Sequence, residues 1–477
     1  MKPLHLFLTS LLILAEIATI VRAMLRPHRD PAARLAWVII IIVAPIIGMV
    51  AYLLLGEARV SASRKERGRT IDADLPRPPV EDKTVETMAA TPYDAPFGLA
   101  RTVNGLGPTA GNRATLAKDS NQAVDAMVAD IDSAHDHVHA CFYIWLDDTN
   151  GLKLKDAMVR AAKRGATVRV LSDALGSRKF VRSPHWAELQ DAGVEARVAL
   201  PVGNLLWTMI RGRVDLRNHR KLLVIDGVIA WCGSQNAADP EFRVKPHYAP
   251  WVDVMSRWQG PVTRDWQFLF VSDWMGEHGE DLSAMLLAPP APATGGIVAQ
   301  VIGTGPTLPY AAMTACFAEL VHSARDELMI TTPYFVPDDA LLYAILSAAR
   351  RGVRTVLVLP ARNDSHIVAA ASRSHYGDLL KAGVELYEYQ CGLLHAKTMV
   401  VDGKVGLIGS ANLDRRSFEL NFENNILFYD ADFASKIRER QNEFLADSKI
   451  VTERMVAQTS MTRRLVQNTL SIFGPLL

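Results

Sequence analysis

The stretch LRNHRKLLVIDGVIAWCGSQN, residues 216–236, decides the fold because its pattern returns in LLHAKTMVVDGKVGLIGSAN, residues 393–412. Each copy reads His-x-Lys, then Asp-Gly, then Gly-Ser-x-Asn. Asp-Gly between two apolar runs is typical of two β-strands joined by a tight turn. The sequence therefore predicts two similar hairpins in a duplicated chain.

Similar helices and strands are expected before each hairpin, in the same order. Before the first, the pattern predicts a helix over 121–134, a strand over 138–146, a helix over 152–165 and a strand over 167–173. Before the second, the corresponding elements are 311–324, 327–335, 340–352 and 353–360. AAKRG and AARRG, then DAGVE and KAGVE, recur at a spacing of roughly 180 residues, which indicates an internal duplication. We expect two α/β halves, 111–286 and 297–477, facing each other about a pseudo-twofold axis and joined by the link 287–296.

The N-terminal 60 residues contain two apolar stretches, LHLFLTSLLILAEIATIV at 4–21 and LAWVIIIIVAPIIGMVAYLLL at 35–55. The second is the stronger candidate because it has no charge over a length that can cross a bilayer, and Pro45 and Gly48 are tolerable in a spanning helix. The first is the weaker candidate because Glu16 interrupts it. No small-residue cleavage site precedes the Arg-rich connection between the stretches. This favours a membrane hairpin over a cleaved signal peptide followed by one anchor.

Both flanks of the second stretch are basic, and the positive-inside rule favours a cytoplasmic body. Residues 61–110 are rich in Pro, Ala, Thr and charged residues without clear periodicity, so we expect a linker there.

The composition excludes several classes of protein. Lys+Arg 52 nearly balances Asp+Glu 51, so the chain lacks the basic field of a nucleic-acid binder, and no nucleic-acid partner is expected. The four cysteines are scattered without metal-ligand spacing, which argues against a zinc site or a disulfide framework.

Each hairpin places a set of polar side chains on one face. His and Lys are two residues apart on a strand, and so are Ser and Asn at the end of the returning strand. These side chains are His219, Lys221, Ser234 and Asn236 in the first copy, and His395, Lys397, Ser410 and Asn412 in the second. Asp226 and Asp402 follow the His by seven residues, an odd step, so their position favours holding the turn.

Two histidines and two lysines suit phosphoryl transfer at a phosphodiester. Lysine and asparagine side chains can hold the non-bridging oxygens and stabilise the transition state without a metal. One neutral imidazole can attack phosphorus, and the other can donate a proton to the leaving oxygen. We therefore expect neither a metal nor a cofactor.

The two motifs resemble the paired HKD signatures of the phospholipase D superfamily. More narrowly, the chain is similar to the bacterial cardiolipin synthases of that superfamily over nearly its full length, in FYIWLDD, DLRNHRK, WVDVMSRWQGP, TPYFVPDD and RRSFELNFENN. The resemblance implies two pseudo-twofold-related phospholipase D-like α/β/α halves in one catalytic body, preceded by an N-terminal transmembrane hairpin. It also implies a multi-pass protein of the bacterial inner membrane.

The resemblance implies roles for individual residues. The catalytic motif residues it implies are His219, Lys221, Asp226, His395, Lys397 and Asp402. The phosphate-binding residues it implies are Asn236, Asn412, Ser234 and Ser410. Glu423 and Asp253 match supporting acids that orient the histidines. His219 is implied to be the nucleophile and His395 the general acid/base, although the symmetry of the motifs leaves this assignment open.

The implied reaction joins two phosphatidylglycerol molecules into cardiolipin and releases glycerol at the membrane bilayer. Three alternatives remain: hydrolysis as in a phospholipase D, phosphatidylethanolamine as the donor, and a membrane-anchored scaffold with a degenerate site. Intact His, Lys and Asn in both copies argue against the scaffold. The segment 200–216 has no counterpart in the second half, and it fits either a buried connection or a membrane-surface segment, as does the C-terminal stretch 461–477. The sequence does not predict the oligomeric state.

Overall fold

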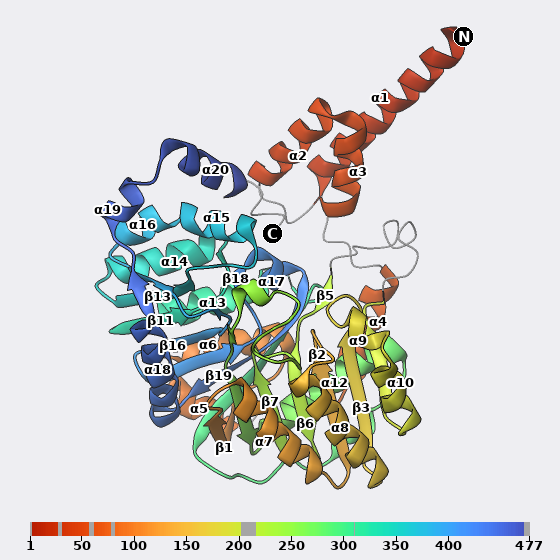
Figure 1. Ribbon diagram of the computed structural model, residues 1–477, viewed down its shortest axis with the longest axis vertical. Coiled ribbons are helices and arrows are strands. Elements are labelled where there is room, and N and C mark those ends of the chain that lie inside the picture. Colours follow the sequence, from red (N-terminus) through yellow and green to blue (C-terminus); the bar gives the residue numbers. More distant parts are fainter. Residues whose placement is uncertain are drawn as a thin grey trace.

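The computed structural model describes residues 2–26, 31–56, 62–77, 82–201, 216–309 and 311–471. Within these residues, sixteen strands form one sheet that runs through the body, with helices packed on both faces (Figure 1). The N-terminal helices α1–α3 stand outside this body, at the end that also carries α15 and α20. The α/β/α layering agrees with the predicted fold class.

The elements follow one another in chain order. The N-terminal helices are α1 (Lys2–Leu25), α2 (Pro31–Val43), α3 (Pro45–Leu55), α4 (Ala62–Asp74), α5 (Asp82–Ala89) and α6 (Asp94–Asn104). The first half comprises β1 (Thr109–Leu116), α7 (Ser120–Asp132), β2 (His137–Phe142), α8 (Thr149–Lys163), β3 (Thr167–Asp173), α9 (Arg178–Val181), α10 (Pro184–Asp191), β4 (Glu195–Ala199), β5 (Arg217–Asn218), β6 (Lys221–Ile225), β7 (Ile229–Gly233), η1 (Pro246–Tyr248), β8 (Trp251–Val252), β9 (Met255–Gln259), α12 (Thr263–His278) and η2 (Ser283–Leu287). The second half comprises β10 (Ile297–Thr304), α13 (Ala312–His322), β11 (Glu327–Thr331), β12 (Phe335–Val336), α14 (Asp339–Arg350), β13 (Arg354–Pro360), α15 (His366–Ser374), α16 (Tyr376–Lys381), β14 (Glu385–Tyr389), β15 (Leu393–Leu394), β16 (Thr398–Val401), β17 (Val405–Gly409), β18 (Leu413–Asp414), α17 (Arg415–Glu419), β19 (Asn421–Tyr429), α18 (Ala431–Ala446), β20 (Ser448–Ile450), α19 (Glu453–Ala457) and α20 (Met461–Ser471).

The strand order confirms the duplication. From the centre outward, one half reads β1-β9-β7-β6-β2-β3-β4 and the other reads β10-β19-β17-β16-β11-β13-β14, with β20 at the edge. The halves join where β1 and β10 pair antiparallel, Thr109 opposite Ala299. Because the sheet continues through this pair, the halves share one core and face each other across the molecule.

Local signals explain why corresponding helices form in both halves. Asp148 caps the first turn of α8 by accepting the N–H of Gly151 at 3.0 Å, and Asp338 caps the corresponding α14 through the N–H of Leu341 at 3.0 Å. Just after the C-termini of α8 and α14, Gly165 and Gly352 adopt φ of 99° and 91°. A residue with a Cβ is strained there, so glycine ends each helix and turns the chain into the next strand.

The two Asp-Gly turns have the same backbone conformation. Asp226 and Gly227 adopt φ of 51° and 65°, and Asp402 and Gly403 adopt 51° and 62°. The Asp226 carboxylate accepts the backbone N–H groups of residues 135, 136 and 137 at 2.9, 2.9 and 2.8 Å. Asp402 likewise accepts those of residues 325–327, and it also accepts the Tyr93 hydroxyl at 3.0 Å. Each aspartate thus ties its turn to the loop that leads into β2 or β11.

Residues 61–110 differ from the linker expected there. Helix α4 packs on α12, where Arg64 pairs with Glu277 and Arg67 donates to the carbonyl of Gly276 at 3.3 Å. Helix α6 buries Phe97, Ala100 and Val103 in the core of the second half. These three residues have a helical spacing, but Pro96 and Gly98 among them obscure the signal.

The second apolar stretch is not one straight spanning helix. The helix breaks at Ala44, and α3 starts at Pro45, which has no N–H to continue the α2 ladder. The chain folds back there, because Trp37 and Tyr52 pack with ring centroids 5.4 Å apart. A Cβ on Gly48 would lie 2.5 Å from the carbonyl oxygen of Ile40, so glycine permits this close approach.

In the described part of the chain, one helix is long and apolar enough to cross a membrane, over Pro3–Leu25 of α1. The stretch at 4–21 is therefore the stronger candidate, contrary to the expectation that favoured 35–55. Residues 202–215 of the connection expected to be buried or membrane-surface lie outside the described residues, as do 472–477.

We predict that Asp226→Asn lowers the free energy of unfolding by about 2 kcal/mol, because three backbone N–H groups lose a charged acceptor. Thermal unfolding of the full-length chain measures this. Asp402→Asn should behave alike. The control Asp125→Asn removes only an exposed ion pair with Lys153 and should change stability by less than about 1 kcal/mol. An unchanged unfolding temperature for Asp226→Asn would contradict the prediction.

Candidate active site

The two His-x-Lys motifs meet at a cavity of about 430 Å³ between the halves. Both motifs contribute, since His219 and Asn236 line it from the first half and His395 and Asn412 from the second. The duplication therefore builds one composite site.

Short strand pairs that cross between the halves hold the two motifs in place. Strand β5, just before His219, pairs with β19 of the second half, and β15, just before His395, pairs with β8 of the first half. The His219 N–H donates to the carbonyl of Phe422 at 2.9 Å, and the His395 N–H donates to that of Val252 at 2.8 Å. Each histidine backbone is thus fixed by the opposite half.

The carboxylates that orient the histidines are crossed in the same way. Nδ1 of His219 lies 2.9 and 3.0 Å from the two oxygens of Glu423. Nδ1 of His395 lies 2.6 Å from Oδ1 of Asp253. Because an ionised carboxylate only accepts, Nδ1 carries the proton in each ring and Nε2 is left for chemistry.

The two serines of the motifs contact the carboxylates. Ser234 Oγ donates to Asp253 at 2.6 Å, and Ser410 Oγ donates to Glu423. The structure therefore differs from the expectation that Ser234 and Ser410 bind phosphate directly. The alternation of side chains along a strand predicted their shared face, but Asp253, just after β8, and Glu423 of β19 lie within hydrogen-bond distance on that face.

Both motif lysines are buried beside the histidines. Lys221 and Lys397 are 0% and 2% exposed, and each Nζ donates to the carbonyl of the histidine two residues earlier at 2.6 Å. Burial lowers the pKa of Lys221 to about 8, with Glu423 opposing the shift. Burial lowers the pKa of Lys397 to about 7, with Asp253 opposing the shift. These ammonium groups titrate close to neutral pH, and a bound anion would raise their pKa values.

The motif asparagines face the cavity from opposite halves. Asn236 uses its Oδ1 to accept the N–H of Ile144 at 3.1 Å, which directs its amide NH₂ elsewhere. Asn412 has a buried Oδ1 that no group in the described residues contacts by a hydrogen bond. The position of both side chains on the cavity wall suits contact with a substrate oxygen.

Burial sets the protonation of the histidines. It lowers the pKa of His219 to about 4 against the opposing effect of Glu423. Burial and Lys397 lower the pKa of His395 against the opposing effect of Asp253. Both imidazoles are thus neutral near pH 7. Aromatic rings pack on each, Tyr143 on His219 at 4.7 Å and Trp251 on His395 at 4.6 Å between centroids.

The two carboxylates stay ionised although they are buried. Burial would raise the pKa of Asp253, but His395 and Lys397 outweigh it and lower the pKa to about 2. Burial is likewise outweighed at Glu423, where His219 and Lys221 lower the pKa. Two ammonium groups therefore balance two carboxylates. An added phosphodiester brings a negative charge that favours protonation of one imidazole.

Asp226 and Asp402 are not brought into this site. They lie at the ends of β6 and β16 away from Lys221 and Lys397, and they bind backbone N–H groups there. Their implied catalytic role is corrected to a structural one. Among the described residues, no three or more His, Cys, Asp or Glu side chains are grouped as a metal site requires.

The sequence motifs contained further cavity residues to which no role was assigned. Tyr143 of FYIWLDD and Trp251 of WVD pack on the histidines, and Trp251 has a buried Nε1 without a protein partner in the described residues. Asn421 donates to Glu423 at 3.1 Å, and Arg217 pairs with Asp173 at 3.2 Å. The positions of these residues near the motifs can be read from the sequence. Only the strand pairs between the two halves show that they line one cavity.

Comparisons with known proteins show what this chain is similar to. A family model described as "Cardiolipin synthase, PLD-like domain" matches residues 127–246 and 317–445, and one described as "Phospholipase_D-nuclease N-terminal" matches 13–57. Cardiolipin synthase A of Edwardsiella ictaluri is 36% identical over 474 residues, covering 97% of this chain and 96% of that protein. Cardiolipin synthase A of Cronobacter sakazakii is 35% identical over 473 residues, covering 97% and 96%. The crystal structure of phosphatidylserine synthase from Haemophilus influenzae Rd KW20 shares the fold, with a TM-score of 0.60 at 15% identity over 80% of this chain and 99% of that chain.

The lysine pKa values predict that anion binding weakens as pH rises. Above about pH 7, Lys397 loses its proton, and Lys221 follows near pH 8. The affinity for tungstate, a phosphate mimic that stays a dianion, should then fall by up to about tenfold per pH unit for each lysine that has lost its proton. Calorimetric titration between about pH 6 and about pH 9 measures this. In Lys397→Arg, which stays charged, the fall should begin only near the pKa of Lys221. A flat affinity across this range would contradict the assignment of these lysines to anion binding.

Proposed function

The chain belongs to the phospholipase D-like cardiolipin synthases, and from that premise we propose how its composite site performs their phosphatidyl transfer. The substrates are two phosphatidylglycerol molecules, and the products are cardiolipin and glycerol. The observation that carries the proposal is the crossed arrangement of His219–Glu423 and His395–Asp253 around one cavity. Two unlike roles, nucleophile and general acid, are then available at a single phosphorus.

In the first step, Nε2 of His219 attacks phosphorus of the first phosphatidylglycerol. The N–P bond forms as the bond from phosphorus to the glycerol headgroup oxygen breaks, and His395 gives that oxygen its proton. The neutral state of His219 supports the nucleophile role. The charge of the bound phosphodiester supports proton uptake by His395, which is neutral in the empty site.

In the second step, a hydroxyl of the second phosphatidylglycerol attacks the phosphohistidine. His395 takes the hydroxyl proton as the O–P bond forms and the N–P bond breaks, which returns both histidines to their starting states. One phosphodiester is exchanged for another, so no nucleotide is consumed. Lys221, Lys397, Asn236 and Asn412 stabilise the non-bridging oxygens in both transition states.

The acids and their serines keep the histidines aligned. Glu423 is 0% exposed and accepts from His219, Ser410 and Asn421, so its position is determined from three sides. Asp253 is held by Ser234. A carboxylate fixed in this way holds the imidazole tautomer and stabilises the imidazolium that forms during proton transfer.

We place the site at the membrane through α1. Its apolar side chains are exposed along the helix, including Leu6 at 72%, Phe7 at 64% and Leu14 at 64%. The bent pair α2–α3 is the second membrane element of a multi-pass arrangement, in the bacterial inner membrane with the body on the cytoplasmic side. The basic residues that follow α3 support this orientation.

An assay of the full-length chain in phosphatidylglycerol mixed micelles tests the reaction. We expect cardiolipin and glycerol from the wild type, and a loss of roughly 10³-fold or more in His219→Ala and His395→Ala. The control His322→Ala changes an exposed histidine at the end of α13 and should retain activity. Phosphatidic acid as the sole product would show that the enzyme hydrolyses the phosphodiester instead of transferring the phosphatidyl group. Release of ethanolamine from added phosphatidylethanolamine would show that this lipid is the donor.

The histidine roles predict which variant accumulates the intermediate. A phosphatidyl ester of p-nitrophenol has a leaving group that needs no proton, so His395→Ala should release about one p-nitrophenol per site and then stop. The phosphatidyl group should be found on the His219 peptide by mass spectrometry after an alkaline quench. His219→Ala should give no burst. An adduct on His395 in the reverse experiment would exchange the two roles.

A further inference from the structure

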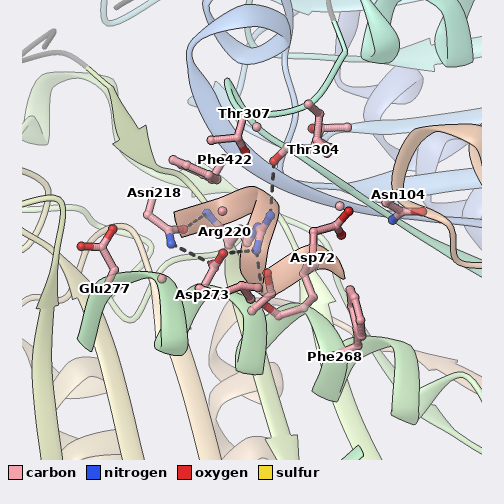
Figure 2. A pocket seen from close by; sticks show the side chains of 18 of the residues that line it. Asp72, Asn104, Asn218, Arg220, Phe268, Asp273, Glu277, Thr304, Thr307 and Phe422 are labelled. Atoms are coloured by element: carbon pink, nitrogen blue, oxygen red, sulfur yellow. Dashed lines mark hydrogen bonds and ion pairs between the residues drawn. The ribbon is translucent and has the colours of Figure 1, made fainter. Parts of the chain in front are cut away.

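A second cavity, of about 150 Å³, lies behind the first motif. Arg217, His219 and Asn421 line the active-site cavity, whereas the alternate residues Asn218, Arg220 and Phe422 line the rear cavity (Figure 2). Successive side chains of a strand point to opposite faces, so β5 and β19 are the wall between the two cavities. Helices α4 and α12 form much of the other side.

Arg220 is the centre of a buried network at the rear cavity. It is 4% exposed, and its Nη1 pairs with Asp273 of α12 at 2.5 Å. Its Nε donates to the backbone carbonyl of Glu423 at 3.2 Å and its Nη2 to that of Thr304 at 3.3 Å. The guanidinium carbon also lies 5.8 Å from the ring centre of Phe422. Figure 2 shows Asn218 reaching the same aspartate, at 3.0 Å.

This network joins both halves directly behind the His219–Glu423 pair. Asp273 and Leu269, whose carbonyl accepts from Arg220 at 3.4 Å, belong to the first half, and Thr304 and Glu423 belong to the second. The second motif has no equivalent, because the residue between its histidine and lysine is Ala396. The two histidine–carboxylate pairs therefore have similar surroundings at the active-site cavity, but only the His219–Glu423 pair has a buried arginine behind it.

We propose that Arg220, held by Asp273, is a positioning residue that keeps the Glu423 carboxylate in register with His219. This inference rests on the proposed roles of His219 and Glu423. Arg220 contacts the backbone of Glu423 and touches no reacting atom. The planar guanidinium matches acceptors on α12, β10 and β19 at once, and an ammonium group presents no such fork. Without these guanidinium hydrogen bonds, the Glu423 backbone can shift, and a shift of about 1 Å in a reacting group can lower turnover about 100-fold.

The rear cavity makes a chemical-rescue experiment feasible. Arg220→Ala enlarges this cavity beside Asp273, and a guanidinium ion matches the group removed. We expect the kcat of Arg220→Ala in the micelle assay to fall about 10- to 100-fold with KM within about twofold of wild type. Millimolar guanidinium should restore a large part of kcat, whereas methylammonium or sodium chloride at equal ionic strength should not. A purely structural role would not give this selectivity.

Matched variants keep the test decisive. Arg257→Ala removes another partly buried arginine, which binds Asp130 at 2.7 and 2.9 Å away from the motif, and it should neither lose kcat selectively nor respond to guanidinium. Arg220→Lys keeps a positive charge opposite Asp273, and it is the test variant if Arg220→Ala does not fold. We expect its kcat to be lower than that of the wild type. Wild-type kcat in Arg220→Lys, or a folded Arg220→Ala without rescue, would overturn the inference. A wild-type protein that makes no cardiolipin would instead overturn the proposed function.

Discussion

The crossed hydrogen bonds between each histidine and the opposite half's carboxylate are the constraint on which the rest of the structure depends. His219 finds Glu423 only because β5 pairs with β19, and His395 finds Asp253 only because β15 pairs with β8. Neither half contains a complete dyad, so docking of the halves and assembly of the site are one event. The β1–β10 pair, which makes the sheet continuous, fixes the distance across which these bonds form. A duplicated fold thereby becomes one enzyme site instead of two.

Burial of these charged groups has two consequences. It lowers the pKa of His219 to about 4 and that of Lys397 to about 7, so the site holds neutral imidazoles and loosely held protons. In the proposed mechanism it also favours transfer to a lipid hydroxyl over hydrolysis, which requires that water be kept from the phosphohistidine. The desolvation cost is opposed by the coulombic attraction of Lys221 to Glu423 and of Lys397 to Asp253. In the proposed mechanism, the negative charge of the substrate favours the imidazolium form of His395, so protonation of this general acid is coupled to substrate binding.

Strong local signals made the hairpins readable from the sequence. Asp-Gly requires positive φ at both turn residues, and His-x-Lys has the period of a strand, so the turn and the shared face followed from a few residues. The partners did not follow. Ser234 and Ser410 lie on the predicted face, yet their oxygens bind acids on strands distant in the sequence. The break at Ala44–Pro45 was read as a tolerated irregularity because only the Trp37–Tyr52 contact shows that the chain folds back. Helix α6 was missed because proline and glycine dilute its period, and packing on α13 decided the outcome.

The proposed reaction requires two histidines in unlike roles, whereas duplication supplies two like ones. The difference therefore has to come from residues outside the shared motif. The described residues show differences of this kind at three places. Glu423 binds His219, whereas Asp253 binds His395. Tyr143 packs on His219, whereas Trp251 packs on His395. Arg220 lies between the His and Lys of the first motif, whereas Ala396 takes this position in the second. The first two change the immediate surroundings of each imidazole. The third differs in kind, because Arg220 pairs with Asp273 of α12, and Glu277 of the same helix pairs with Arg64 of α4. The first motif is thus the one that is joined through α12 to α4, the helix that follows α1–α3 in the chain.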